Sequence, residues 1–166
     1  MSLRREDGSF ELPNVTAEQA IEMFGPIPTV LNTIKIIESQ VPEEYGHVPG
    51  YEQEKMYFIE MMRIMEAKGI GFRDLMERGV FASVATFEAQ LARELRVGDE
   101  VKVATGVTEL DRQVLFEQEM ERGGKHVSKN SIVISLRGRA NTMIPIPTWV
   151  SEKLRVDTTP QEMVAE

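Results

Sequence analysis

The sequence predicts a single α+β domain in which one antiparallel sheet surrounds one long helix. Two observations support this fold class. A broad apolar helical face runs through residues 51–68, and four strand-like segments joined by short turns follow from residue 80 onward. We find no internal repeat, low-complexity segment or linker. The 166 residues are enough for one domain with a substantial core.

Composition narrows the class of protein further. Hydrophobic residues make up 42% and charged residues 28% of the chain, as in ordinary globular proteins. The formal net charge of -8 disfavours general binding to nucleic acid or to an anionic membrane. The absence of cysteine excludes disulfides and thiolate chemistry, and two histidines argue against a His-rich metal site. No run approaches the ~20 apolar residues of a membrane span and no signal peptide is recognisable, so we expect a cytoplasmic protein.

The central helix is predicted over Tyr51–Lys68. Pro49-Gly50 ends the preceding loop, and Gly69 is a good C-cap. Its apolar positions follow i, i+3, i+4 and i+7 spacing, with further apolar residues that widen the face: Phe58, Met61, Met62, Met65, with Met56, Tyr57 and Ile64. Such a broad face suggests a helix wrapped by a sheet, and the methionines suit either core packing or an adaptable acyl pocket.

The other elements follow from alternation and turn residues. A short helix ends at Phe24 before Gly25-Pro26. The remaining elements are a strand over residues 29–37, a short helix over 72–78, strands over 80–94, 100–110, 113–122 and 125–137, and a helical end over 149–154. We therefore divide the chain into an N-terminal extension (1–27), one domain (28–155) and a disordered tail (156–166).

The segment before the central helix, residues 41–51, reads Val-Pro-Glu-Glu-Tyr-Gly-His-Val-Pro-Gly-Tyr. It contains two carboxylates and a histidine beside the start of a helix. A helix N-terminus has unpaired N–H donors and partial positive charge, so it can hold a polarised carbonyl group or an anion. This loop is therefore the predicted chemical centre.

In order and spacing, several segments over residues 29–154 resemble the hotdog fold, in particular the 4-hydroxybenzoyl-CoA thioesterase-like group of acyl-CoA thioesterases. The matching segments are Tyr45-Gly46-His47-Val48, Gly69, Asp74-Leu75-Met76-Glu77-Arg78-Gly79, Leu95-Arg96-Val97-Gly98-Asp99-Glu100-Val101, Thr108-Glu109-Leu110 and Pro145-Ile146-Pro147-Thr148-Trp149. The extension has no counterpart in that family.

The resemblance implies a catalytic carboxylate at Glu43, where the family has an aspartate three residues before the loop glycine. A backbone N–H near Gly50 would hold the thioester oxygen, although Pro49-Gly50 replaces the family's usual asparagine pair. The same loop supplies further candidate substrate-binding residues: Tyr45, Gly46, Val48 and Tyr51. Without the resemblance, Glu43 would be read as a solvated loop glutamate.

A second resemblance is to the hotdog hydroxyacyl-ACP dehydratases, which use a loop histidine and a helix glutamate. Here these would be His47 and Glu60, with a spacing one residue shorter than in that family. Glu60 lies on an apolar helical face, where desolvation raises a carboxyl pKa and suits acid–base chemistry. The alternatives are that His47 fixes the turn and that Glu60 pairs with Arg63 or Lys68.

The phosphates of CoA need basic side chains, and the resemblance points to Arg112, Arg137 and Arg139. Each could equally be a solvated charge at a strand end. No metal or other cofactor is expected, with CoA present only as part of the substrate.

Together these observations predict an enzyme that hydrolyses an acyl-CoA or acyl-ACP thioester. The alternatives are a dehydratase or hydratase, and a non-catalytic acyl-CoA-binding hotdog protein. Because open sheet edges are usually paired, we expect a homodimer with a continuous sheet, or a homotetramer, with active sites at the subunit interface.

Overall fold

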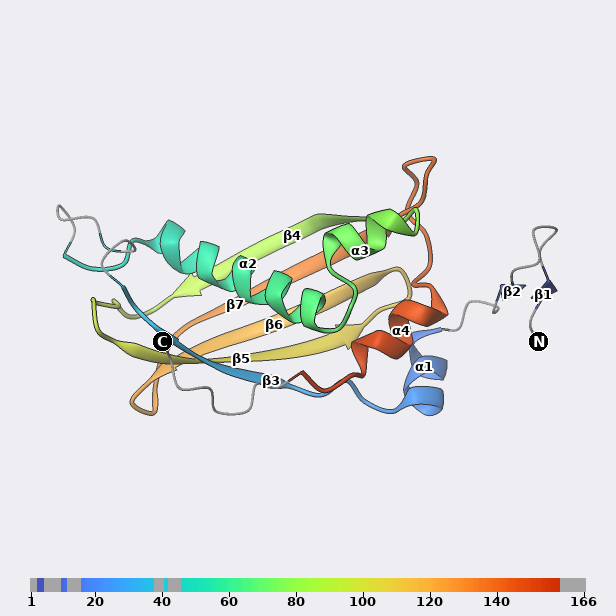
Figure 1. Cartoon of the computed structure of the whole chain (residues 1–166). Helices are drawn as coiled ribbons and strands as arrows, with labels where there is room; N and C mark the ends of the chain where they lie inside the picture. The colour runs from blue at the N-terminus through green and yellow to red at the C-terminus, as the bar shows by residue number, and fades with distance from the viewer. Residues whose placement is uncertain (1–2, 5–9, 12–15, 38–40, 42–45, 159–166) are drawn as a thin grey trace.

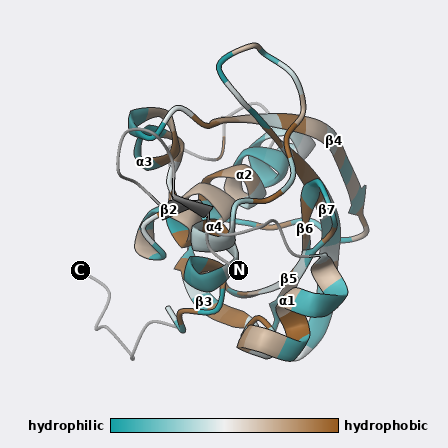
Figure 2. Cartoon of the chain, turned by 90° about the vertical axis from the view of Figure 1, so that its right-hand side faces the viewer, coloured by the Kyte–Doolittle hydropathy of each residue, from teal (hydrophilic) through white to brown (hydrophobic). Residues whose placement is uncertain are grey.

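The computed structural model describes the backbone of Leu3–Arg4 and Phe10–Glu11, and residues 16–37, 41 and 46–158 in full. One five-stranded antiparallel sheet, in the order β3-β5-β6-β7-β4, curves around α2 (Figures 1 and 2). The elements are β1 (Leu3–Arg4), β2 (Phe10–Glu11), α1 (Ala17–Phe24), β3 (Val30–Lys35), α2 (Gly50–Ala67), α3 (Phe72–Glu77), β4 (Phe81–Leu91), β5 (Glu100–Glu109), β6 (Gln113–Arg122), β7 (Lys125–Arg137) and α4 (Thr148–Leu154). The predicted α+β class and hotdog architecture are confirmed.

Helix α2 buries one face in the curve of the sheet. Its buried apolar residues are Met56, Tyr57, Met61, Ile64 and Met65. Phe58 and Met62, which the sequence pattern placed at the centre of the stripe, are only half-buried and lie at its flank. The buried face is rotated relative to this stripe, so that two polar residues, Gln53 and Glu60, also point inward. No helix in the described part of the chain is long and apolar enough to cross a membrane.

The strands match their predicted ranges closely, and those of β6 and β7 agree at both ends. On β5 and β6 buried and exposed side chains alternate, as expected for a sheet with one covered face. The β6–β7 hairpin turns at Gly123-Gly124, where both residues have positive φ (58° and 77°), as a type I′ turn requires. β4 pairs with β7 rather than with β5, its neighbour in sequence.

One end of the sheet is covered by α1 and α4, which lie side by side in Figure 1. The guanidinium of Arg155, in the residue after α4, binds the Glu109 carboxylate at the end of β5 and donates to the Gly25 carbonyl after α1 (3.0 Å). Ser151 also donates to Glu109 (2.9 Å). The residues before 28 that were assigned to an extension thus include a helix packed on the domain. They also include the β1–β2 pair.

The other end of the sheet is closed by the turn between β4 and β5. The Asp99 carboxylate accepts from the Arg96 N–H (2.8 Å) and from Arg122 on β6 (2.7 Å), while its carbonyl accepts from the Ile36 N–H (2.8 Å). Burial alone would raise the pKa of Asp99, but these donors and the two guanidinium charges outweigh it and hold the pKa below 3.8. The ionised carboxylate therefore links β6 to the turn, and the Asp99 backbone carbonyl links the turn to the residue after β3.

We predict that Asp99→Asn lowers the free energy of unfolding, and that this loss depends on pH. A carboxyl whose pKa is lowered by folding stabilises the protein above its unfolded pKa and loses that contribution as pH falls through its folded pKa. The difference between the wild type and the variant should be largest above about pH 5 and vanish in more acidic solution. Urea unfolding between neutral and acidic pH measures it. Glu117→Gln, on the exposed face of the sheet, is the control, and a pH-independent difference for Asp99→Asn would contradict the prediction.

Candidate functional site at the start of α2

The loop before α2 is held by its backbone and by one buried side chain. Gly46 has φ +66°, a left-handed conformation that favours glycine. Val48 is buried, and its N–H donates to the Leu95 carbonyl (2.7 Å). Val48 therefore anchors the loop, and its N–H is already used. The chain then enters α2 through Pro49, whose extended backbone directs Gly50 into the first helical position.

The first turn of α2 presents backbone donors. The N–H groups of Glu52 and Gln53 donate to the Pro49 carbonyl (3.0 and 3.2 Å). Those of Gly50 and Tyr51 precede any intrahelical acceptor, and the proline cap supplies no side-chain acceptor. A Cβ at Gly50 would lie 2.7 Å from the Leu91 Cδ1 of β4, so glycine lets this strand approach the helix start. The arrangement suits a carbonyl oxygen that gains negative charge.

A second segment, residues 92–96 after β4, packs beside the helix start. Besides the Val48–Leu95 bond, Gln53 donates from Nε2 to the Arg93 carbonyl (3.3 Å). Glu94 Oε1 lies 4.0 Å from Nδ1 of His47. The segment therefore brings two exposed arginines, Arg93 and Arg96, close to the loop. Arg93 fell inside the strand predicted over residues 80–94 and Arg96 in the turn after it, so neither was predicted as a ligand, although two basic residues so near a candidate anion site are a usable signal.

Only some of the predicted loop residues lie in the described part of the chain. Glu43 and Tyr45 lie outside the described residues. His47 is about one-third exposed, and Tyr51 is exposed beside the first turn. The described part of the site therefore comprises the helix start, His47 and the 92–96 segment.

Glu60 is buried in mid-helix, with only 2% of its surface exposed. Asn32 of β3 donates from Nδ2 to both carboxylate oxygens (3.2 and 3.1 Å), and Arg63 approaches Oε2 (3.4 Å). Glu60 thus faces β3. The alternative prediction, that Glu60 pairs with Arg63, accounts for one of its two partners. Sequence reasoning missed Asn32, the polar partner on the neighbouring strand.

The structure does not bring His47 and Glu60 together within one chain. Glu60 lies ten residues beyond Gly50, or about 15 Å along the helix axis. His47 precedes the helix on the side of the 92–96 segment, whereas Glu60 is engaged by β3. The histidine–glutamate pair of a dehydratase is therefore not assembled in a single copy.

The three predicted CoA-binding arginines lie at the opposite end of the sheet from Gly50. Arg112 is in the β5–β6 turn, and Arg137 ends β7 opposite Phe81, the first residue of β4. Arg137 donates to Ser83 (3.4 Å) and to the Asn141 carbonyl (3.0 Å). Arg139 lies against Gly79. The start of α2 instead adjoins Leu91, ten residues further along β4.

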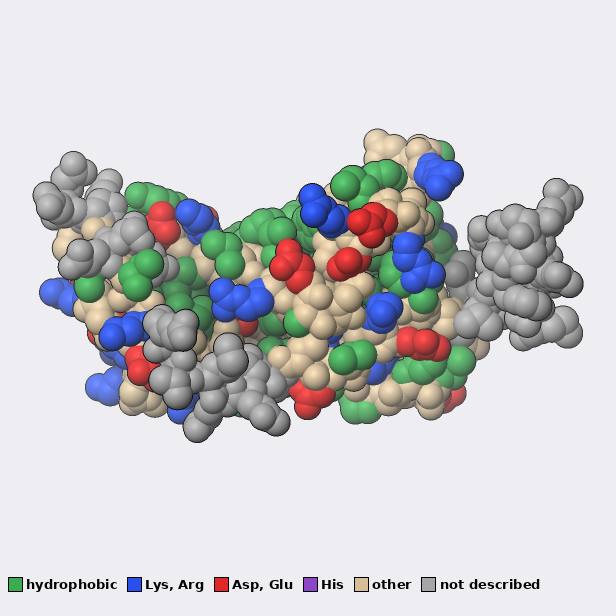
Figure 3. Space-filling model, viewed as in Figure 1, with side chains coloured by type: hydrophobic (Ala, Val, Ile, Leu, Met, Phe, Trp, Pro, Cys, Tyr) green, Lys and Arg blue, Asp and Glu red, His purple; other side chains and the backbone are tan. Residues whose placement is uncertain are grey.

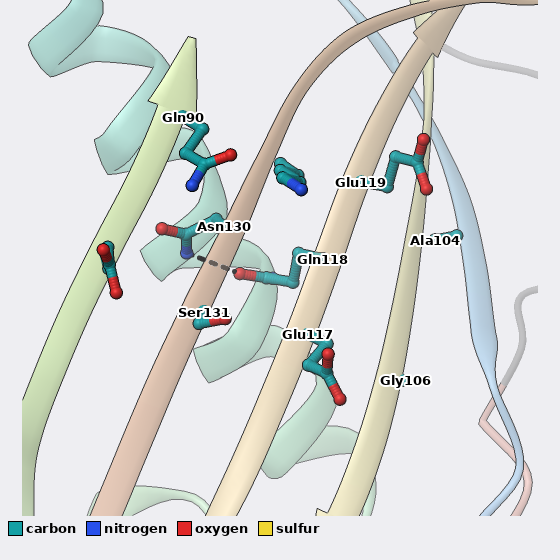
Figure 4. Close-up of a pocket in the computed structure, with 10 residues that line it drawn as sticks. Gln90, Ala104, Gly106, Glu117, Gln118, Glu119, Asn130 and Ser131 are labelled. Atoms are coloured by element: carbon teal, nitrogen blue, oxygen red, sulfur yellow. Dashed lines mark hydrogen bonds between the residues drawn. The ribbon is translucent and has the colours of Figure 1, made fainter.

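A polar layer crosses the inner face of the sheet under α2, and sequence reasoning missed it. It consists of Thr105, Gln118 and Asn130 on the adjacent strands β5, β6 and β7, all buried. Figure 4 shows the hydrogen bond from Asn130 Nδ2 to Gln118 Oε1 (3.0 Å). The layer separates two apolar clusters, one around Phe116 and the other around Met120. Polar residues at inward-facing strand positions were the available signal.

A depression of about 360 Å³ lies in the same region of the sheet (Figure 4). Most of its lining side chains occupy the strand positions that alternate with the buried ones, so it opens on the face opposite α2. Three of them are glutamates, Glu88, Glu117 and Glu119, against one Lys129. This acidic surface is unsuited to CoA phosphates. Among the described residues, no cluster of three or more histidines and carboxylates could hold a metal ion.

Comparison with known proteins gives similarity in structure alone, because no family model and no curated sequence matches the chain. A 1,4-dihydroxy-2-naphthoyl-CoA thioesterase from Synechocystis superposes with TM-score 0.70 at 9% identity, over 76% of this chain and 96% of that one. A Staphylococcus aureus protein solved in complex with CoA gives TM-score 0.70 at 11% identity, over 85% and 92% of the two chains. A hypothetical protein from Thermus thermophilus gives 0.66 at 21%, over 75% and 96%. Together with the sheet order and the enclosed helix, these similarities show that the chain has the hotdog fold.

Proposed function

We propose that this protein hydrolyses the thioester of an acyl-CoA or acyl-ACP. The observation that carries the proposal is the start of α2, where the N–H groups of Gly50 and Tyr51 precede any intrahelical acceptor and His47 lies in the loop just before them. Support comes from similar solved structures named as thioesterases, and from one bound to CoA. Helix-start donors match the main need of this reaction, which is to stabilise negative charge on the thioester oxygen.

In the proposed mechanism, Glu43 acts as the general base. It removes a proton from a water molecule as the water oxygen attacks the thioester carbon. The carbonyl oxygen becomes an oxyanion that accepts from the Gly50 N–H. Collapse of this intermediate breaks the C–S bond, and the departing thiolate takes up the proton from Glu43 or through His47. The products are a carboxylic acid and a free thiol, and the steps use no metal or redox cofactor.

For the phosphates of CoA, we propose Arg93 and Arg96 as ligands. Both lie on the segment that packs against the helix start, and guanidinium groups bind phosphate through paired donors. Of the arginines predicted from sequence, Arg137 and Arg139 could reach this region only from a second copy. Arg112, in the turn that joins β5 and β6, lies further from the β4 edge.

We also propose a homodimer in which β4 pairs with itself. β4 is an edge strand of 11 residues that exposes Phe81, Val84 and Leu91, and a long apolar edge is normally covered. Figure 3 shows hydrophobic side chains along the border between α2 and β4. Antiparallel pairing centred on Thr86 would set the partner subunit's Phe81 opposite Leu91. The partner subunit's Arg137 would then come within about 10 Å of the helix start.

Glu43→Gln should reduce thioester hydrolysis about 100-fold or more, because the amide cannot accept the proton from water. Free-thiol release from a panel of short, long and aromatic acyl-CoAs measures it. Glu60→Gln is the matched control, expected to retain activity since Glu60 faces β3. Survival of activity in Glu43→Gln with loss in His47→Ala and an enoyl product would favour a dehydratase. Binding without turnover would favour a non-catalytic protein.

Gly50→Pro tests the oxyanion donor directly. Proline is well tolerated at the first helical position, and Pro49 already has the extended backbone (φ −61°, ψ 155°) that a following proline requires. The variant should therefore fold, lack this N–H, and lose about 100-fold or more in kcat. Gly50→Ala keeps the N–H and asks only for a shift of the Leu91 side chain. Equal kcat in the two variants would remove Gly50 from the oxyanion site.

Replacing Arg93 and Arg96 together with alanine should raise KM for acyl-CoA about 10-fold with little change in kcat, since the lost contacts lie far from the reacting carbon. Arg112→Ala is the control and should leave KM within about twofold. A higher KM for Arg112→Ala, with an unchanged KM for the double alanine variant, would assign the CoA phosphates to the far end of the sheet.

The proposed dimer predicts twice the mass of one chain in sedimentation equilibrium. Thr86→Lys should give a monomer, because the register centred on Thr86 would set the two introduced charges directly opposite each other across the paired edge. A wild-type monomer would refute the pairing. A dimer that persists in the variant would place the interface elsewhere.

A further inference from the structure

The polar layer under α2 leaves one acceptor oxygen without a donor. Gln118 donates from Nε2 to the Tyr57 carbonyl of α2 (3.0 Å) and approaches Thr105 Oγ1 (3.5 Å), while its Oε1 accepts from Asn130. The amide of Gln118 is therefore fully used. Asn130 is only 4% exposed, and its Oδ1 has no hydrogen-bond partner in the described part of the chain. A buried acceptor without a donor is unfavourable, so such an atom calls for an explanation.

The direction of this oxygen follows from the planar amide. The nitrogen of Asn130 points to Gln118 on β6, so its oxygen points the other way, toward β4 (Figure 4). Ala89 of β4 is opposite Asn130 in the sheet register. The same stretch of β4 reaches the start of α2, where Leu91 touches Gly50. The unpaired oxygen therefore faces the seam between α2 and β4, further into the domain than the proposed oxyanion site.

A second unpaired acceptor lies nearer the helix start. Gln53, 2% exposed, uses its Nε2 on the Arg93 carbonyl, whereas its Oε1 has no partner among the described residues. Gln53 is one turn into α2. Asn130 is hydrogen-bonded to Gln118, which in turn donates to the Tyr57 carbonyl. Along the axis of α2, Asn130 therefore lies at the level of Tyr57, seven residues or about 10 Å beyond Gly50. Both acceptors thus lie inward of the helix start, and neither finds a donor among the described residues.

We propose that Asn130 is a specificity-determining residue that accepts a hydrogen bond from a hydroxyl group on the acyl chain of the substrate. The inference rests on the proposed thioesterase function. With the thioester oxygen at Gly50, the pantetheine arm must lead outward to solvent, so only the acyl group can reach an atom about 10 Å further in. The preferred substrate is then an acyl thioester with a hydroxyl several carbons from the carbonyl. An unsubstituted chain would leave the Asn130 oxygen unpaired and is disfavoured for that reason.

The experiment compares matched acyl-CoA pairs, hexanoyl with ω-hydroxyhexanoyl and octanoyl with ω-hydroxyoctanoyl, by free-thiol release. In the wild type, kcat/KM for the hydroxylated member of at least one pair should be about 10-fold higher or more. Asn130→Leu should bring this ratio close to one, and Asn130→Asp, which keeps an oxygen at this position, should retain a preference. Thr105→Val removes the far end of the layer and should leave the ratio unchanged.

A wild-type ratio below about twofold in both pairs would overturn the inference, since the oxygen would then be satisfied by something other than the acyl group. An unchanged ratio in Asn130→Leu would overturn it as well. If Asn130→Leu does not fold, the inference is judged from the two wild-type ratios and from the ratio measured with Asn130→Asp.

Failure of the proposed function is recognised separately, as no thiol release from any member of the panel. In that case, non-hydrolysable thioether analogues with the same chains test the inference by isothermal titration calorimetry on the wild-type protein. At least about 10-fold tighter binding of a hydroxylated analogue would support it, and equal binding would refute it.

Discussion

The structure depends on the burial of one face of α2 in the curve of the five-stranded sheet. Residues on that face contribute to both apolar clusters, with Met61 and Met65 in one and Met56 and Tyr57 in the other. Because the sheet encloses the helix, the positions of its two ends are fixed. One end presents backbone donors at Gly50, and the other is tied through Lys68, which donates to the carbonyls of Leu154 and Val156 (both 2.7 Å).

This core is not uniformly apolar. Its polar residues on the β3 side of α2 differ in their hydrogen bonding from those on the β4 side. On the β3 side, Glu60 is satisfied by Asn32 and Arg63, an arrangement that fixes the helix and leaves no obvious place for a substrate. On the β4 side, the side-chain amides of Gln53 and Asn130 donate hydrogen bonds, but their oxygens accept none from the described residues. A complete buried network stabilises a fold, whereas a buried acceptor without a donor calls for an explanation, and we assign these acceptors to a ligand. The difference between the two sides is the physical reason for placing the acyl group between α2 and β4.

The two ends of the sheet have different characters. The end at the start of α2 gathers the loop histidine, the 92–96 segment and the Asp99 turn, whereas the opposite end carries α1, α4 and the Glu109–Arg155 pair. An antiparallel pairing of β4 with its own copy would set these two ends side by side. Pairing along the long exposed edge of β4 would therefore decide both the oligomeric state and which residues of a second copy complete the binding site.

The sequence by itself determined the elements and the fold class. Turn residues and periodicity are local, so the ranges of β6, β7 and α2 and the position of the loop before α2 could be predicted to within a residue or two. The rotation of α2, the pairing of β4 with β7 and the inward polar layer could not. They depend on which side chains meet across strands far apart in sequence, as Asn130 meets Gln118 and Asn32 meets Glu60. Only the tertiary structure decided that Glu60 faces β3 and that the predicted arginines lie at the far end of the sheet, because strand order and helix rotation are set by packing of the whole core rather than by any local pattern.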